Sequence, residues 1–510
     1  MNNIIRQQLR SFSTRIQRRL DRENKKREDT GPVMQGAGAR YEISERVRAV
    51  GAGGVGVIDE MVKAIGLPNL IDSRVQLLKT HQPYHESDHI ASIAYNVLAG
   101  GEHLQNLELR RYDENYLDML GARRLPGPST VGDFCRRFES KENVDALQES
   151  INEARLRVWS TQPEDFFDHA LIDADGSMVE ASPCTKDADF SYKRTFGFQP
   201  LLVTLANTQE VLFLDNRAAS RPSHEGAAAR LDQSVDLVRR AGFKKITLRG
   251  DTDFSQTEYL DGWNDQGVNF VFGYAAYKGV ERKAEQIDDE DWELLERGDR
   301  YQIKTLPRAR PTNTREEEVR EQEYLNIHLA EEHVSEFKHC PNKCGRTYRM
   351  VVVRKLVTHE RGQALLFQQT RYLFYITNRW DVSAREVVRL ANNRCDQERV
   401  IGQLKSDVKS LRCPLDNLHS NWAYMVSATL AWNLSRWFAL LLPEGGRWKE
   451  RRREEKTKVL RMNFGTFLSS FMLVPTQVVR AARRVALRLL AWNSWQPVFF
   501  RALDSIRLLA

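Results

Sequence analysis

Apolar positions between Glu42 and about Glu153 recur at three- and four-residue spacing, which is the pattern of amphipathic helices. Within this stretch Pro126–Thr130 predicts a turn, and Ser129 or Thr130 is placed to cap the helix VGDFCRRF that follows. The pattern therefore predicts a helical domain of about 110 residues. The clearest periodic series are Val57, Ile58, Met61, Val62 and Ile65, and then Ile90, Ile93, Ala94, Val97 and Leu98.

The pattern changes at His169, where apolar residues form short runs bounded by turn-forming residues, as in alternating strands and helices. The turn Asn207-Thr208-Gln209 between two such runs predicts a hairpin. The order along the chain is strand, strand, strand, helix, strand, helix, strand, which indicates an α/β fold. The runs are 170–172, 200–206, 210–214, the helix 225–241, then 245–249, a second helix, and 268–274.

Residues 280–345 are polar and charge-rich and read as an insertion, followed by strands at Met350–Lys355 and Tyr372–Thr377. A strongly periodic helix is expected from Ser383 to Lys409, and the last hundred residues are expected to be helical. The most apolar long stretch, Asn421–Leu442, contains an arginine and two asparagines, so a buried helix explains it better than a membrane span.

Charge adds one feature to this picture. The net charge is only +7, but residues 1–30 hold nine Lys/Arg against four Asp/Glu, and residues 447–461 hold eight against three. Basic segments on a near-neutral body favour contact with a polyanion, although a solvated charged helix accounts for either segment alone. Six cysteines and the absence of an apolar signal segment at the N-terminus predict a cytoplasmic protein.

One motif suggests a nucleotide site. Gly51–Gly56 satisfies GxGxxG, and Asp72 follows about twenty residues later. A dinucleotide site needs those glycines between a buried strand and a helix N-terminus, yet residues 43–50 are weakly strand-like at best. A loop that starts a helix is therefore favoured over a nicotinamide-binding site.

Three acidic residues are placed where a metal site is expected. Asp175 ends the first strand of the α/β stretch, Asp251 ends the strand after the first helix, and Glu398 lies in the periodic helix. Such carboxylates can hold two magnesium ions for phosphodiester transfer. Asp173 lies on the same strand face as Asp175. On one continuous helix, Arg394, Glu398 and Lys405 would share a face, although a solvated ion-pair ladder has the same spacing.

These residues carry a resemblance. The runs IDADGS, LRGDTDFS and NNRCDQERVIGQLKSD resemble the three acidic motifs of DDE transposases of bacterial insertion sequences, including their R-(3)-E-(6)-K signature. With YHESDHIASIAYNVLAGGEHLQNLELRR, GPSTVGDFCRRF and FGFQPLLV, the chain more closely resembles the thirteen-eighty insertion-sequence family, within the wider insertion-sequence-four-like group. The resemblance covers roughly residues 40–470.

The resemblance implies a ribonuclease-H-like core with a strand-rich insertion, and cut-and-paste transposition in the bacterial nucleoid. It implies Asp175, Asp251 and Glu398 as ligands of two Mg²⁺ ions, with Mn²⁺ as a substitute, and Asp173 as an auxiliary residue. Arg394 and Lys405 would contact backbone phosphates; Ala391 stands where relatives often have tyrosine. The regions expected are a basic arm (1–40), a helical DNA-binding domain (41–160), the first part of the core (165–275), the insertion (276–370), the last core strand and catalytic helix (371–412), and a helical C-terminal region (413–510).

The partners expected are double-stranded DNA, as terminal inverted repeats and target, and a second copy of the chain in the synaptic complex; no membrane is expected. Base readout is expected from the helices around Ser129–Phe138 through Arg136 and Arg137, in a helix-turn-helix-like arrangement. Backbone contacts are expected from the arm and from Arg451, Arg452 and Arg453.

Several weaker candidates have a packing interpretation beside the functional one. Trp292 can stack on a base or pack in a core. His339, Cys340 and Cys344 offer three zinc-ligand types where a structural site needs four. Arg480, Arg483, Arg484 and Arg488 are expected to form a basic helix stripe that contacts DNA or solvent.

Two other functions remain open at this point. The alternative to a transposase is a catalytically inactive, transposase-derived protein that binds DNA, and the presence of all three acidic motifs in order argues against such decay. A nicotinamide-dependent oxidoreductase that uses Gly51–Gly56 comes third.

Overall fold

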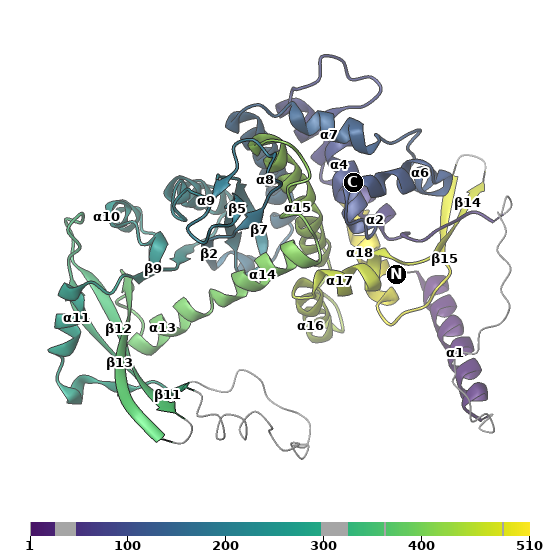
Figure 1. Ribbon diagram of the computed structural model, residues 1–510. Coiled ribbons are helices and arrows are strands. Elements are labelled where there is room, and N and C mark those ends of the chain that lie inside the picture. Colours follow the sequence, from purple (N-terminus) through teal and green to yellow (C-terminus); the bar gives the residue numbers. More distant parts are fainter. Residues whose placement is uncertain (1, 26–46, 297–324, 362–363, 482–483, 510) are drawn as a thin grey trace. The chain divides into compact units, whose positions relative to one another are not determined.

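The computed structural model describes residues 2–25, 47–296, 325–361, 364–481 and 484–509 (Figure 1). The chain divides into two compact units. The first contains residues 1–167, 177–221 and 399–510, and the second contains residues 168–176 and 222–398. With a large mixed sheet and many helices, the protein is α/β in class.

The N-terminal part of the first unit is helical, which confirms the prediction from periodicity. The turn before VGDFCRRF is also present, but the helix begins earlier than expected. Gly127 is its N-cap and Pro128 its first residue, so Ser129 and Thr130 lie inside the helix and neither caps it. The helices are α1 (Asn3–Lys25), α2 (Val55–Ala64), α3 (Leu67–Arg74), α4 (Glu86–Leu98), η1 (Leu104–Asn106), α5 (Leu107–Arg111), α6 (Glu114–Leu120), α7 (Pro128–Arg136), α8 (Lys141–Trp159) and η2 (Glu164–Phe167).

The glycines at 51–56 serve backbone packing. The strand before them, β1 (Ala49–Val50), has two residues and pairs antiparallel with β14 (Thr476–Ala481). A Cβ atom on Gly54 would lie 1.8 Å from the Phe471 carbonyl oxygen, and one on Gly53 would lie 1.9 Å from Thr476 Oγ1. The segment starts helix α2, as favoured above, and the parallel strands of a dinucleotide fold are not built around it.

A buried polar network holds the hairpin of the first unit against two helices. The hairpin β6 (Leu201–Leu205) and β7 (Glu210–Asp215) matches the prediction. Glu210 is fully buried, and Arg155 of α8 donates from Nε to Glu210 Oε1 at 2.9 Å. The indole Nε1 atoms of Trp159 and Trp437 donate to the same carboxylate at 3.0 and 2.7 Å. The pairing matters because an isolated buried charge would be costly. The short strands β3 (Val179–Glu180), β4 (Asp189–Phe190) and β5 (Phe196–Phe198) form a separate sheet in the order β3-β5-β4.

The apolar stretch at 421–442 forms the buried helix α15 (Leu418–Leu440), as predicted. No helix among the described residues is long and apolar enough to cross a bilayer. The expected basic helix stripe at 480–488 is wrong. Val485, Leu487 and Leu489 alternate with Arg484, Ala486 and Arg488, and this period of two forms strand β15 (Arg484–Leu489), which pairs with β14 in a hairpin. Arg483 lies outside the described residues. The rest of this region is α16 (Lys449–Leu460), α17 (Phe464–Phe467), the π-helical turn η5 (Leu468–Met472) and α18 (Gln496–Ile506).

The second unit is built on a mixed sheet with the strand order β10-β11-β12-β13-β9-β8-β2. The strands β2, β8 and β9 are parallel, and the others pair antiparallel. Helix α9 packs on β2 and β8, and α10 packs on β9. The elements are β2 (His169–Gly176), α9 (Ala227–Ala241), β8 (Lys245–Gly250), η3 (Thr252–Phe254), α10 (Thr257–Asp265), β9 (Asn269–Tyr274), α11 (Lys278–Glu285), η4 (Asp289–Asp291) and β10 (Glu293–Leu294).

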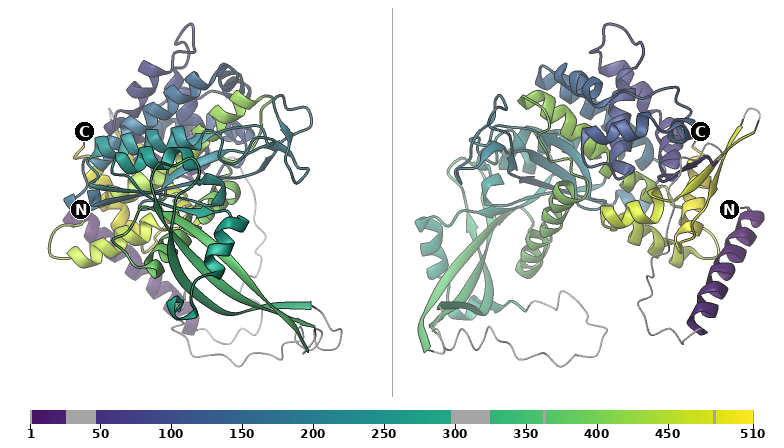
Figure 2. Two further views of the ribbon diagram at one scale, coloured as in Figure 1. Left: turned by 90° about the vertical axis from the view of Figure 1, so that its left-hand side faces the viewer. Right: turned by 45° about the vertical axis from the view of Figure 1, so that its right-hand side comes forward.

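Three long strands follow, side by side in Figure 2: β11 (Leu325–His339), β12 (Tyr348–Arg361) and β13 (Ala364–Thr377). Strand β11 was not identified from the sequence, because four charged residues and three histidines interrupt its apolar positions. The single helix expected at 383–409 is in fact two, α13 (Ala384–Asn392) and α14 (Cys395–Ser406), with a break at Asn393 and Arg394. Val387 and Val388 of α13 pack on valines of β9, β11 and β12.

Candidate active site

The first two acidic residues lie at the same edge of the sheet. Strands β2 and β8 are parallel neighbours, with Asp173 opposite Arg249. Asp175 is near the end of β2, and Asp251 directly follows β8. Parallel strands present their carboxyl ends at one edge, where α/β proteins place their sites. The Asp251 side chain accepts a hydrogen bond from the Asp253 amide at 3.0 Å, which fixes the first residues after β8.

One guanidinium joins these two carboxylates. Arg394 Nη1 lies 3.1 Å from Asp175 Oδ2, and its Nη2 lies 4.0 Å from Asp251 Oδ2. The arginine reaches them from the break between α13 and α14. It therefore does not share a helical face with Glu398 and Lys405, so the expected stripe on one continuous helix is wrong. The break turns Arg394 toward the sheet edge.

A buried ion pair between Arg249 and Asp173 joins strands β8 and β2 near this edge of the sheet. Arg249 is 2% exposed and binds Asp173 in a bidentate manner, with Nε–Oδ1 at 2.7 Å and Nη2–Oδ2 at 2.8 Å. Its Nη1 also donates to the Leu390 carbonyl at 3.0 Å, which attaches α13 to β8. Arg249 thus engages both carboxylate oxygens of Asp173. Sequence analysis did not identify Arg249, because its pairing with Asp173 on the neighbouring strand depends on the register of β2 and β8.

Glu398 belongs to the same unit and is exposed on the first turn of α14. Its neighbour Gln397 is buried and donates from Nε2 to the Asp173 carbonyl at 3.1 Å. Arg394, just before α14, and Gln397, in its first turn, thus both bind the carboxyl end of β2, through Asp175 and the Asp173 carbonyl. Sequence analysis had no signal for Gln397. Lys405 lies seven residues after Glu398 on α14, and its Nζ donates to the Met178 carbonyl at 2.7 Å.

The electrostatics of the carboxylates suit a cation. Burial raises the pKa of Asp175 to about 6; the charge of Arg394 lowers it and that of Asp251 raises it. Burial also raises the pKa of Asp251, again against the effect of Arg394. Two partly buried carboxylates share one guanidinium, so their negative charge is incompletely balanced. Carboxylate oxygens are the donors that Mg²⁺ and Mn²⁺ prefer, so the residues present fit a divalent metal.

The two arginines expected to read bases, Arg136 and Arg137, lie at the C-terminal end of helix α7. Arg136 is the last residue of α7 and Arg137 its C-cap, whereas a recognition helix reads bases from its N-terminal residues. Arg136 Nε binds Asp416 at 2.9 Å, and its Nη1 binds Asp133 at 2.9 Å. The geometry thus gives Arg136 acidic partners within the protein. Arg137 is exposed.

The aromatic and zinc candidates are engaged in packing and hydrogen bonds. Trp292 is 8% exposed, and the Arg354 guanidinium lies 4.3 Å from its ring centroid. This geometry favours the packing interpretation of Trp292. His339 Nε2 lies 3.3 Å from the Tyr274 hydroxyl, and Cys344 Sγ donates to the Thr257 carbonyl. Cys340 is exposed, and the described residues bring no fourth zinc ligand to this group.

The basic tract at 447–461 forms helix α16. Arg451 is largely exposed and pairs with Glu455, and Arg453 pairs with Glu444 and Asp165. Arg452 donates from Nη1 to the Gly445 carbonyl.

The sequence matches a family of transposase domains. The solved structure of a piggyBac transposase synaptic complex with hairpin DNA aligns with 85% of this chain and 83% of its own, at 9% identity and a TM-score of 0.35. No curated protein sequence matches the chain. The family described as "Transposase DDE domain group 1" matches residues 47–510, nearly the whole chain. The protein therefore belongs to this family of DDE-domain transposases.

Proposed function

We propose that the protein cuts DNA at the ends of an insertion sequence and joins them to a target, by metal-dependent phosphodiester hydrolysis and strand transfer. The observation that carries the proposal is the pair Asp175 and Asp251, held at one sheet edge by Arg394. The residue before Glu398, Gln397, is bound to the Asp173 carbonyl of the same strand as Asp175. The parallel strands β2, β8 and β9 with their crossover helix support a ribonuclease-H-like core.

Asp175, Asp251 and Glu398 would hold two Mg²⁺ ions, or Mn²⁺ in their place. The metal pair would activate a water or a 3′-hydroxyl and stabilise the leaving oxygen. Arg394 orients the two aspartates and limits their mutual repulsion before a metal arrives. Lys405 would pair with a backbone phosphate near the cleaved bond, because an ammonium cannot ligate a metal but suits a phosphate. Two copies of the chain would act together on the two ends.

The test is strand cleavage of a plasmid that carries the coding region with its native flanking DNA. Wild-type protein is expected to nick the element ends in Mg²⁺, and Asp251→Asn is expected to lose that activity. The matched control is Asp253→Asn, an exposed aspartate two residues away, which should retain it. Binding of the ends without nicking in Mg²⁺ or Mn²⁺ would identify an inactive DNA-binding protein instead.

A further inference from the structure

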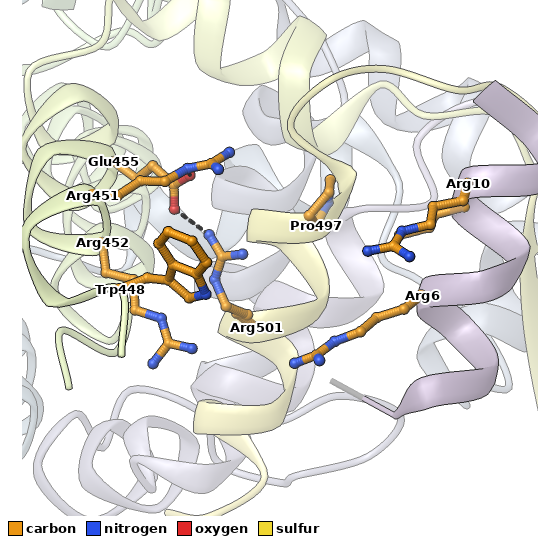
Figure 3. A pocket seen from close by; sticks show the side chains of 9 residues that line it. Arg6, Arg10, Trp448, Arg451, Arg452, Glu455, Pro497 and Arg501 are labelled. Carbon is orange, nitrogen blue, oxygen red and sulfur yellow. Dashed lines mark hydrogen bonds and ion pairs between the residues drawn. The ribbon is translucent and has the colours of Figure 1, made fainter. Parts of the chain in front are cut away.

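The two basic segments of the chain meet in one pocket of the first unit. Its volume is about 290 Å³, and its walls come from α1, α16 and α18 (Figure 3). Arg6 and Arg10 of α1 extend toward Arg501 of α18, and Trp448 lies between Arg501 and the start of α16 (Figure 3). The lining residues are Arg6, Leu9, Arg10, Trp448, Arg451, Arg452, Glu455, Pro497 and Arg501.

The pocket has far more positive than negative charge. Five of its side chains are arginines and one is a carboxylate. Glu455 is fully engaged, with Arg451 Nε 3.1 Å from Oε1 and Arg501 Nη2 on Oε2. For Arg6, Arg10 and Arg452, the described part of the chain supplies no carboxylate within ion-pair distance.

The neighbouring arginines help to lower the pKa of Arg501. Burial lowers its pKa; Glu455 opposes that shift, and Arg452, Arg451 and Arg6 add to it. Like charges held this closely favour the arrival of an anion that neutralises them. Arg6 and Arg10 are exposed, so an anion reaches them from solvent.

We propose that this pocket binds backbone phosphates of duplex DNA and thereby docks α1 onto α16 and α18. The inference rests on the proposed function for its partner and adds Arg6, Arg10 and Arg501 to the DNA-binding residues. Guanidinium groups suit phosphate oxygens because they donate paired hydrogen bonds in a fixed fork. A duplex fits better than a small anion, because α1 carries four more exposed arginines after the pocket residues, which a long polyanion can contact and a single phosphate cannot: Arg15, Arg18, Arg19 and Arg22.

The experiment measures the affinity of full-length protein for a short mixed-sequence duplex in EDTA, over a range of salt concentrations. Mixed sequence suffices because phosphate contacts carry no base information. Arg6→Ala/Arg10→Ala should reduce the slope of log affinity against log salt by about 1.8, or 0.9 per contact. The matched control, Lys278→Ala/Arg282→Ala, removes the same charge at the same four-residue spacing from the exposed helix α11, outside the pocket, and should reduce the slope by less than half as much.

A second comparison tests whether the helices form one site. The DNA affinities of Arg452→Ala, of Arg6→Ala/Arg10→Ala and of the triple variant are compared. Urea unfolding of Arg452→Ala checks that this variant remains folded. If α1 and α16 hold the same phosphates, the fold-losses in affinity do not multiply, because the first change already undoes the site. Fold-losses that multiply, or equal slopes for the pocket pair and the control pair, would overturn the proposal.

Inorganic phosphate is a further arm. At matched ionic strength, and at the concentration of phosphate groups in the duplex, inorganic phosphate should leave the duplex bound, because a single phosphate lacks the contacts that the rest of the duplex makes. Selective displacement would assign the pocket to free phosphate and refute the inference. Failure of this inference is distinguishable from failure of the proposed function, because the two are measured separately. A protein that does not nick DNA can still show the expected salt dependence of binding, and a protein that nicks DNA can lack it.

Discussion

Replacing Asp175 with asparagine is expected to stabilise the metal-free protein while abolishing DNA cleavage. The Asp175 side chain is 17% exposed and its pKa is raised to about 6 from an ordinary value of 3.8. The folded state therefore binds the proton more tightly than the unfolded state. Stability falls as pH rises from about 4 to 6 and is then constant with respect to this group.

The magnitude follows from the shift. About two pKa units at 1.36 kcal/mol each give roughly 3 kcal/mol of destabilisation above pH 6 in the absence of metal. This figure already includes the attraction of Arg394, because the pKa reflects all neighbours together. Asparagine resembles the protonated carboxyl in shape and charge, so Asp175→Asn should recover about 1–3 kcal/mol at pH 8 and almost nothing at pH 4.

The assay is thermal and urea unfolding of both proteins at pH 4, 6 and 8, in EDTA and in Mg²⁺. For a unit of this size, each kcal/mol of stability is expected to shift the melting temperature by about 2–4 °C. Mg²⁺ should raise the melting temperature of the wild type above that of its EDTA form and leave Asp175→Asn nearly unchanged. If Asp175→Asn is less stable than the wild type at pH 8 in EDTA, the electrostatic reasoning about the site is refuted.

Three further predictions concern the surroundings of the site. Arg394→Gln should shift the acidic limb of the pH–cleavage profile to higher pH, because Arg394 lowers the pKa values of both Asp175 and Asp251; an unchanged limb would contradict this. Asp173→Asn should cost about 3–5 kcal/mol in urea unfolding by leaving Arg249 buried without its partner. Asp168→Asn, which breaks an exposed pair with Lys244, should cost about 0–1 kcal/mol, and equal costs would refute the argument. Trp292→Ala should cost about 3–5 kcal/mol through lost packing without changing DNA affinity in binding titrations, and a selective loss of affinity would restore its role in stacking.

The sequence predicted those elements whose periodicity was unambiguous. Strand β2 and the β6–β7 hairpin are flanked by turn residues, and α15 covers the most apolar long stretch of the chain, so each was identified. The β14–β15 hairpin was assigned as a helix, because two arginines four apart, Arg484 and Arg488, share one face both of a helix and of a strand. The break at Arg394 had no local signal, since neither glycine nor proline marks it.

The acidic residues of the candidate site were found because carboxylates at strand ends are recognisable without coordinates. The residues that hold these acidic residues in place, Arg249 and Gln397, were not predicted from the sequence. Arg249 and Gln397 act through contacts with residues 76 and 224 positions away, Asp173 in both cases, and such pairings depend on the assembled sheet. The meeting of α1 with α16 and α18 is likewise a tertiary feature, which the charge distribution showed only as two separate segments.

The most direct test of the central claim is a change of metal preference. Asp251→Cys replaces a carboxylate with a thiolate, which binds the hard Mg²⁺ poorly and the softer Mn²⁺ better. If Asp251 ligates the catalytic metal, this variant should cleave the element ends in Mn²⁺ but not in Mg²⁺, whereas Asp253→Cys should cleave in both. Cleavage by Asp251→Cys in Mg²⁺ at the wild-type rate would contradict the assignment of the metal site.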